Sequence, residues 1–490
     1  MPTAMPTTQP PPSYAIPPSR RRIVAMIVAS TLFMEQMDGT VLTTALPTMA
    51  RTFGVDVAQT AVALTSYMLS LAIFIPASGP VADRFGGRRV LQSAIVVFMA
   101  GSLLCSMAPG LWSLAAARML QGMGGAMMVP VGRLVILQNV PKSALIGAMF
   151  WMMLPATLGP MIGPVVGGVL TTYLSWRWIF YINIPVGLAA IVLTHIFIPQ
   201  IRAPEIIPFD MRGIMLSGVG LAALMLGVEL SSHGQVSLPG MAGLCVVGIA
   251  GLVAYARHAR HVAHPVLDLS LWRVTTFRVS ICAGMFTRLA TGAIGFLLPS
   301  FLQLEFGLSA ARSGMLTFVA PVGALLVRVL AVRVYRRWGF RNILAFNAWV
   351  LPATCCFLAM VGAQWPLWIL VVTMLLLGMS QALQFTGYNT IAYADMPTER
   401  MSAATSFYST AQQMSLSLGI CVSAGVLSLS RMAFSPAWAA DATAATFSAA
   451  FMTMGVLAAP ASLLLARLSP RAGAEISGHT HEMGQPAPKV

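Results

Sequence analysis

Long apolar runs recur along almost the whole chain, and each is long enough to cross a lipid bilayer as a helix. Such a helix needs about 20 mostly apolar residues. Fourteen runs of this kind lie at residues 23–47, 60–80, 90–108, 111–133, 143–170, 176–198, 211–231, 238–257, 276–303, 313–335, 342–363, 366–393, 402–429 and 444–467. Only 9% of the residues are charged, whereas soluble domains carry about 25%. We therefore predict an all-α polytopic membrane protein.

The runs fall into two sets of six separated by a pair. This grouping predicts a first six-helix bundle at residues 23–198, two linker helices at 199–265 and a second six-helix bundle at 266–468. The ends of the chain, residues 1–22 and 469–490, are predicted to be disordered tails. No loop is long enough for a separate soluble domain, and no GxxxxGK[ST] motif is present. These features argue against an enzyme or an ATP-driven module.

The basic residues are concentrated on one side of the predicted membrane. If both termini are cytoplasmic, the inner loops hold 21 of the 29 Lys and Arg residues and the outer loops hold 4. Loops rich in Lys and Arg stay on the cytoplasmic side. The asymmetry accounts for the net charge of +15 without a nucleic-acid partner. It predicts a multi-pass protein of the inner (cytoplasmic) membrane with both termini in the cytoplasm.

Two acids, Glu35 and Asp38, interrupt the first apolar run near its middle. A charged group at that depth costs at least about 2.5–3.5 kcal/mol, so such groups face a protein interior or a watery cavity. Residues three apart share one helix face. Burial and a neighbouring carboxylate both disfavour the charged form of a carboxyl group. We therefore expect this pair to bind and release a proton; the alternative is a hydrogen-bonded pair that serves helix packing.

Two arginines lie well inside predicted spans. Arg118, in the fourth span, cannot lose its proton and needs acceptors, which backbone carbonyls near the helix start could supply. Arg288, in the ninth span, has no acid after it in that span before Glu305. It is expected to line a central cavity, where it pairs with an acid of the first span or meets an anionic substrate. Arg133 is expected at the membrane interface.

Polar amides in the second half are candidates for bonds between helices or to substrate: Gln381, Gln384, Asn389, Gln412 and Gln413. Of these, Gln384, Asn389 and Gln412 are taken, with Arg288, as the predicted substrate-binding residues. Methionines cluster around the fourth and fifth spans, where they suit either a packed core or a promiscuous binding surface. Glu229, at the end of the seventh span, is expected to be a solvated helix end.

The loop after the second span carries a compact group of Gly, Asp and Arg residues at 79–89. Gly79 is expected to permit close helix approach, and Gly86 a tight turn. Asp83 can accept hydrogen bonds from a helix N-terminus or an arginine, which would form a conformational latch with Arg84 and Arg88. A weaker copy follows the tenth span, where Gly339 aligns with Gly86 and the acid is replaced by Arg336. Two related halves are typical of transporters with a site between them.

Small residues recur every four positions in the fifth span, at Gly159, Gly163 and Gly167. This spacing predicts a flat helix face for close packing. Pro160 and Pro164 add kinks. The flat face could serve ordinary packing, a seam between the two halves, or both.

Five stretches, at 38–47, 79–89, 118–126, 159–168 and 176–187, resemble motifs of the major facilitator superfamily, and within it of the fourteen-helix drug:proton antiporter family. The resemblance implies two six-helix bundles plus two linker helices, and proton-coupled export of amphipathic drugs, dyes and biocides by alternating access. It also implies that Asp38 binds the proton, that Arg118 takes part in the relay, and that residues 79–89 form the latch. The antiporter motif would comprise Gly159, Pro160, Gly163, Pro164, Gly167 and Gly168.

The predicted function is therefore multidrug efflux, with the proton as coupling ion and no cofactor or metal. The expected partners are a small-molecule substrate and the lipid bilayer; periplasmic or outer-membrane efflux partners are unknown. One rival keeps the fold but exports an anionic metabolite or a metal chelate through Arg288. A rival of another class, a non-transporting membrane receptor, predicts indifference to neutral replacement of both acids. A channel is disfavoured by the antiporter-like fifth span.

Overall fold

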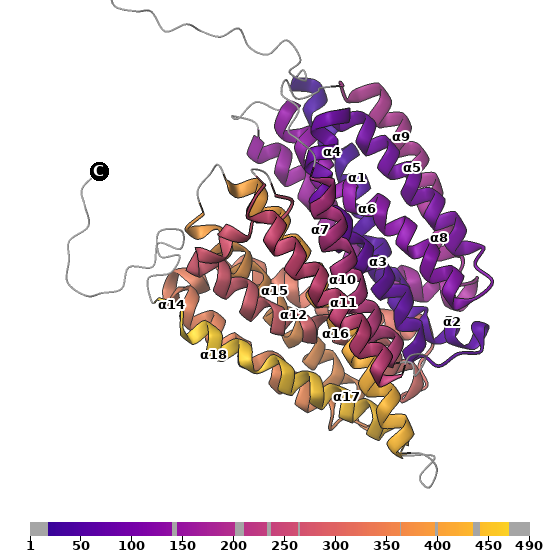
Figure 1. Cartoon of the computed structure of the whole chain (residues 1–490). Helices are drawn as coiled ribbons and strands as arrows, with labels where there is room; N and C mark the ends of the chain where they lie inside the picture. Colours follow the sequence, from indigo (N-terminus) through magenta and orange to yellow (C-terminus); the bar gives the residue numbers. More distant parts are fainter. Residues whose placement is uncertain are drawn as a thin grey trace, which may run out of the picture.

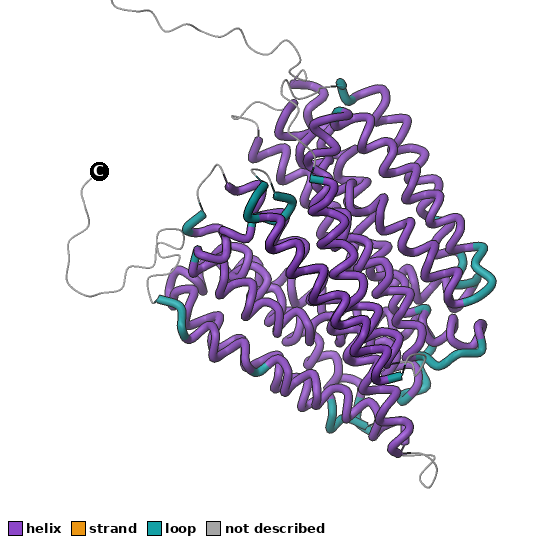
Figure 2. The backbone as a smooth tube through the Cα atoms, in the orientation of Figure 1, coloured by secondary structure: helices purple, strands orange, loops and turns teal. Residues whose placement is uncertain are grey.

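The computed structural model describes residues 18–139, 145–200, 210–232, 237–262, 265–362, 364–396, 400–434 and 442–469. All regular structure in these residues is helical, and short loops join the helices (Figure 2). Most of each predicted tail lies outside the described residues. The first helix begins at Pro18, several residues before the predicted start of the first span.

The first half of the chain contains six long helices: α1 (Pro18–Val41), α3 (Val62–Phe74), α5 (Gly87–Ser106), α6 (Leu111–Asn139), α7 (Leu145–Tyr173) and α9 (Asn183–Phe197). Short segments extend or connect them: η1 (Leu42–Thr44), α2 (Leu46–Phe53), η2 (Ala58–Ala61), η3 (Ile75–Ala77), α4 (Ser78–Phe85) and α8 (Trp178–Tyr181). Two further helices, α10 (Met211–Ser232) and α11 (Leu238–Ala259), follow.

The second half contains η5 (Leu269–Arg273), α12 (Thr275–Leu304), α13 (Ala310–Thr317), α14 (Val319–Leu358), α15 (Leu367–Ala394), α16 (Met401–Phe434), α17 (Ala442–Ala458) and α18 (Pro460–Ala466). The label α14 covers parts of two predicted spans, because the backbone leaves helical geometry at Gly339.

Ten helical segments of the described residues are long and apolar enough to cross a membrane. They are Ala58–Ala82, Gly87–Ser106, Leu111–Ile136, Trp178–Phe197, Pro239–Ala259, Thr275–Leu304, Ala310–Val327, Leu367–Ala394, Ala403–Arg431 and Ala444–Ala466. Helices also occupy the other predicted runs, at 23–47, 143–170, 211–231 and 342–363. The chain is thus an all-helical, multi-pass membrane protein.

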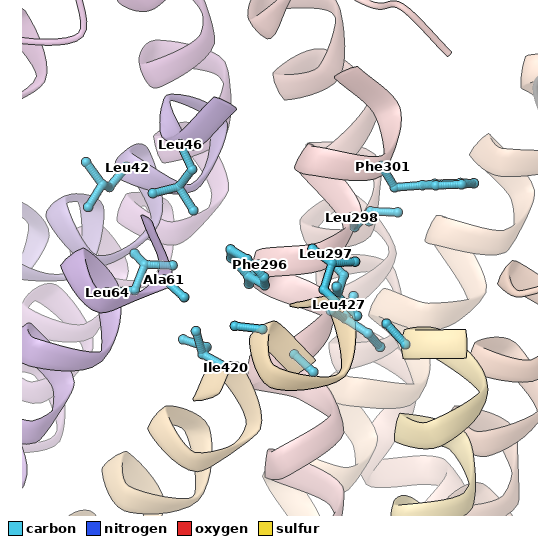
Figure 3. Close-up of a cluster of buried hydrophobic side chains, with 14 of the residues drawn as sticks. Leu42, Leu46, Ala61, Leu64, Phe296, Leu297, Leu298, Phe301, Ile420 and Leu427 are labelled. Atoms are coloured by element: carbon cyan, nitrogen blue, oxygen red, sulfur yellow. The ribbon is translucent and has the colours of Figure 1, made fainter. Parts of the chain in front are cut away.

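Among the described residues, the largest hydrophobic core shared by the two halves lies at one end of the molecule. We call this the joined end; it carries α2 and the start of α13. There Leu64 of α3 and Phe296 of α12 belong to one buried cluster with Ile420 of α16, as Figure 3 shows. Removing these apolar surfaces from water or lipid into one close-packed cluster holds the halves together.

At the opposite end, which carries α4 and the end of α18, each half has its own core. We call this the separated end. One cluster includes Leu91 and Val135 of the first half, and another includes Leu344 and Leu465 of the second. Figure 1 shows the same arrangement, because the two sets of helices meet near α2 and diverge away from it.

Polar contacts between the halves also lie at the joined end. The Gln303 side chain donates to the Thr44 carbonyl at 3.0 Å, and the Ala311 amide donates to the Thr172 hydroxyl at 3.0 Å. Arg431 of α16 forms an ion pair with Asp56, just before η2. The hydrogen bonds and the ion pair therefore reinforce the shared core.

The helices α10 and α11 lie beside the junction of the halves. Leu221 and Met225 of α10 pack with Leu69 of α3 and Cys421 of α16, so α10 touches both halves. By contrast, α11 packs mainly on α10, and only 11% of its most apolar stretch, within Pro239–Ala259, is buried inside the protein. Most of α11 therefore faces outwards.

Candidate functional site

A fully buried ion pair joins α1 to α6. The Arg118 guanidinium donates to Asp38 Oδ2 at 2.5 Å, and neither side chain has exposed surface. Arg118 also donates from Nε to the Ala63 carbonyl at 3.0 Å, so it uses a backbone acceptor as well as an acid. Arg118 therefore binds one acid of α1 and one backbone carbonyl of α3.

Two amide side chains complete the surroundings of Asp38. Gln121 of α6 and Asn183 of α9 each donate to Asp38 Oδ1 at 2.9 Å. Ser102 of α5 accepts from both amides, at 3.3 and 3.0 Å. Asp38 therefore binds groups from two further helices besides α1, and its negative charge is compensated by Arg118. In this conformation both Asp38 oxygens accept hydrogen bonds.

Glu35 lies one turn away from Asp38 and has very different surroundings. The Tyr67 hydroxyl donates to its Oε1 over a long distance of 3.5 Å. The other oxygen, Oε2, is buried without a partner among the described residues. The Tyr67 ring lies 4.2 Å from the Arg118 guanidinium carbon, so Tyr67 links Glu35 to the ion pair. The two acids predicted to act together are therefore not equivalent.

Arg288 lies in α12, in a group of tyrosines. Its guanidinium donates to the Tyr408 hydroxyl and lies 4.6 Å from the Tyr408 ring centre and 5.8 Å from that of Tyr388. The side chain is 6% exposed. Among the described residues Arg288 forms no ion pair. Its predicted pairing with an acid of the first helix is therefore not formed in this conformation.

The predicted substrate-binding amides have unequal surroundings. Gln384 is buried and donates to the Leu344 carbonyl at 3.2 Å, so it ties α15 to α14. Asn389 donates to the Phe385 carbonyl of its own helix at 2.7 Å. Gln412 is half-buried on α16. Gln384 thus serves helix packing in this conformation, whereas Asn389 and Gln412 keep partial exposure.

The predicted latch segment lies at the separated end. Gly86 has φ +88°, a left-handed conformation that favours glycine, and this confirms the predicted tight turn. Gly339, its counterpart in the second half, has φ +73°, as the alignment of the two loops predicts. The prediction for Gly79 was wrong: a Cβ there would meet nothing within 4 Å, because no neighbouring helix packs against that face of α4.

The arginines of this segment bind within the first half. Arg88 donates to the Ile198 carbonyl at 3.3 Å, beyond the end of α9. Arg84 is exposed and lies over the ring of Phe85. The side chains of Asp83 and Glu229 lie outside the described residues.

The small residues of α7 divide between two neighbours. A Cβ on Gly159 would lie 3.0 Å from the Phe33 carbonyl, and one on Gly163 or Gly167 would overlap α1. The Gly159–Gly163–Gly167 face therefore packs on α1, within the first half. By contrast, a Cβ on Gly168 would meet the Ala310 backbone of α13.

The seam between the halves is therefore formed by other residues of the same motif. The Pro164 carbonyl lies against Gly314 of α13, so a Cβ on Gly314 would overlap it. Pro160, Pro155 and Pro164 all lie inside the continuous helix α7.

The family model of the Major Facilitator Superfamily matches residues 28–420. The chain belongs to this superfamily. Its match spans both halves and the helices between them, and so includes α1, α6 and α12 with the two arginine sites.

Relatives in this superfamily are similar over most of their length. The chain is 36% identical over 408 residues to a protein of Serratia proteamaculans named as multidrug resistance protein MdtD, covering 82% of this chain and 84% of the relative. It is 34% identical over 432 residues to a protein of Haemophilus influenzae named as transport protein HsrA, covering 88% and 92%.

Solved structures of other transporters share the fold. A peptide-transporter-family protein in complex with 5-aminolevulinic acid has a TM-score of 0.69 at 13% identity, covering 92% of this chain and 96% of that one. A D-xylose–proton symporter has a TM-score of 0.65 at 14% identity, covering 91% and 97%. At these identities the likeness shows a major facilitator fold and nothing about substrate.

Four contributors to the buried site were missed in the sequence: Tyr67, Ser102, Gln121 and Asn183. Two of them had a signal, since Gln121 and Asn183 lie inside stretches that resemble superfamily motifs. The sequence contains no such signal for Tyr67 and Ser102. A single hydroxyl in an apolar helix is common, and its partner comes from a distant part of the chain.

Proposed function

We propose that this protein is a proton-coupled exporter of small molecules, of the fourteen-helix drug:proton antiporter family. Three observations support the proposal. The relatives include proteins named for multidrug resistance. The five motif-like stretches lie in order along the chain. Helices lie within all fourteen predicted runs, and α10 and α11 would be the two linker helices between the proposed bundles at 23–198 and 266–468.

The observation that carries the proton-coupling proposal is the contrast between Glu35 and Asp38. A buried carboxylate without a partner is unfavourable as an anion, so Glu35 in this conformation is best accommodated with a proton. Asp38, in contrast, accepts hydrogen bonds from Arg118 and two amides. We therefore assign proton exchange to Glu35, with Asp38 and Arg118 as the charged pair that responds to it through Tyr67.

The joined and separated ends suggest how alternating access works in this chain. Arg84, Arg88 and Arg341 lie near the separated end, and loops rich in arginine face the cytoplasm. The described arrangement would then be open to the cytoplasm and closed at the outer side, in an inner membrane with both termini cytoplasmic. Opening outwards requires the shared core and the α7–α13 contact to part. The 79–89 segment would then close the cytoplasmic side as a latch.

The test is transport by purified protein in proteoliposomes with an imposed proton gradient. A panel of cationic, neutral and anionic amphipathic dyes supplies the substrates, and a pH-sensitive dye reports proton movement. Glu35→Gln is expected to abolish coupled transport while substrate binding persists, because the amide keeps the shape but cannot titrate. Glu305→Gln is the matched control, since Glu305 follows α12 and is only half-buried.

The double variant Glu35→Gln/Asp38→Asn separates the candidate classes. If it still transports, and transport still stops when an uncoupler dissipates the gradient, the proton-coupling assignment is refuted. If wild-type protein binds substrates but moves neither dye nor protons, the receptor class is favoured instead.

A second candidate on the same fold is an exporter of an anionic metabolite or a metal chelate. The buried Arg288 favours it, because a fixed cation that has no carboxylate partner among the described residues repels cationic drugs and attracts anions.

A further inference from the structure

The Arg288 side chain folds back along α12, and its guanidinium lies on Gly284, one turn earlier in the helix. A Cβ on Gly284 would lie 2.6 Å from Arg288 Nη1 and 3.2 Å from Cζ, and the three atoms nearest to it all belong to this guanidinium. Side chains on a helix point towards its N-terminus, and residues four apart share a face. Glycine at this position therefore leaves the space that the guanidinium occupies, and an alanine would displace it.

Two tyrosines contact the same guanidinium. It donates to the Tyr408 hydroxyl, and the rings of Tyr408 and Tyr388 both lie within about 6 Å of it, the range of a cation–π contact. The hydroxyls of Tyr388 and Thr287 are hydrogen-bonded at 2.8 Å, which holds the Tyr388 ring against α12. Among the described residues, no carboxylate forms an ion pair with Arg288. The buried guanidinium is thus accommodated by neutral aromatic groups.

The helices that carry Arg288 and Tyr408 are packed backbone to backbone. A Cβ on Gly292 of α12 would overlap the Leu416 carbonyl of α16, and a Cβ on Gly419 of α16 would overlap the Leu289 carbonyl of α12. Small residues at such a crossing allow the two helices to approach closely. Because these contacts fix the distance between α12 and α16 beside Arg288, the guanidinium can leave the Tyr408 hydroxyl by rotation of its own long side chain.

We propose that Gly284 and Tyr408 determine substrate specificity by storing the Arg288 guanidinium, which an anionic substrate must draw away from them. A hydrogen bond from a guanidinium to a carboxylate is about twice as strong as one between neutral groups, so a carboxylate competes with the Tyr408 hydroxyl for Arg288. The favoured substrate is an organic monoanion with an apolar body. Storage lowers the affinity for this anion. The inference rests on the proposed transport function and names its substrate class.

Equilibrium binding to purified full-length protein tests the storage of Arg288 without requiring transport. Three ligands share one ring system and differ in charge: naphthalene-2-carboxylate, 2-naphthylmethanol and 2-naphthylmethylammonium. Calorimetry at neutral pH and low salt compares wild type with four variants. They are Gly284→Ala, Tyr408→Phe, Arg288→Gln and the double variant Tyr408→Phe/Arg288→Gln.

Two matched controls make the same chemical changes where Arg288 is not the partner. Gly295→Ala adds a Cβ elsewhere on α12, where it would meet nothing within 4 Å. Tyr335→Phe removes another tyrosine hydroxyl of the second half, which donates to the Leu383 carbonyl at 2.6 Å. Both controls are expected to bind all three ligands as wild type does.

The two storage variants are expected to gain affinity for the anion. Gly284→Ala and Tyr408→Phe should each bind the carboxylate about threefold to tenfold more tightly than wild type, because the anion no longer displaces a neutral hydrogen bond. Arg288→Gln should weaken the carboxylate by about tenfold or more, and the double variant should bind it no more tightly than Arg288→Gln. Affinity for the alcohol should change by less than about twofold throughout.

Three results would overturn the storage of Arg288. The first is no gain in carboxylate affinity in either storage variant. The second is an equal gain for all three ligands, which would indicate a general loosening of the packing. The third is a gain that persists in the double variant, which would mean that Arg288 does not bind the anion. If Arg288→Gln does not fold, Arg288→Met, which keeps a long flexible side chain, replaces it in both comparisons.

The proposed proton coupling is tested separately by dye transport in proteoliposomes. Coupled transport by wild type without any gain in the storage variants would refute only this inference. A gain in the storage variants without coupled transport by wild type would refute only the proposed proton coupling.

Discussion

Replacing Asp38 by Asn should destabilise the protein, whereas replacing Glu35 by Gln should not. Asp38 accepts hydrogen bonds from Arg118, Gln121 and Asn183 on its two oxygens. An asparagine has one acceptor oxygen, so its amide nitrogen must face at least one of these donors. It also leaves the Arg118 charge without compensation in a site that has no exposed surface.

The contacts of Asp38 and Glu35 determine how much each replacement should change the unfolding free energy. Removing one partner of a buried ion pair costs about 3–5 kcal/mol of folding free energy. Glu35 accepts a long hydrogen bond from Tyr67, and its Oε2 has no partner among the described residues, so Glu35→Gln should change the unfolding free energy by less than about 1 kcal/mol. The double variant Asp38→Asn/Arg118→Gln should be more stable than Asp38→Asn alone, because no buried charge remains unpaired.

The assay is unfolding of the purified full-length protein in mixed micelles, followed by tryptophan fluorescence. The four proteins of the cycle are wild type, each single variant of the Asp38–Arg118 pair and the double variant, with Glu35→Gln alongside. The reasoning is refuted if Asp38→Asn is as stable as wild type, or if the double variant is no more stable than Asp38→Asn. Either result would mean that the ion pair does not contribute to folding.

Three further predictions follow from the arrangement of the halves. Gly168→Ala places a Cβ against the Ala310 backbone and should separate the two halves at the joined end, which increased labelling of outer-side cysteines would show. Gly243→Ala is the control, because a Cβ on Gly243 meets nothing within 4 Å. Asp83→Asn should slow transport with little change in substrate affinity, whereas Arg336→Gln should be tolerated better. If initial-uptake assays give the same transport rate for Asp83→Asn and wild type, the latch hypothesis is refuted. Both termini should be cytoplasmic, so outer-side reagents that label cysteines at 89 or 341 would contradict the topology.

The sequence alone determined the helical class, the positions of the long helices and the turn at Gly86. These properties are local: apolar runs of sufficient length form helices in a membrane, and a left-handed turn requires a residue without a Cβ. The sequence alone also identified Glu35 and Asp38 as candidate functional residues, because they are acids inside an apolar run. The family followed from motifs, each of which is also a short local pattern.

Only the tertiary structure decided which of these groups meet. Asp38 bonds with residues 80 to 145 positions away, and no periodicity in the sequence selects Arg118 or Asn183 as its partner. The same holds for Gly79, which looks like a packing glycine but faces no neighbour. The physical reason is that partner choice depends on how helices far apart in the chain pack. Hydropathy and turn preference, in contrast, are properties of adjacent residues.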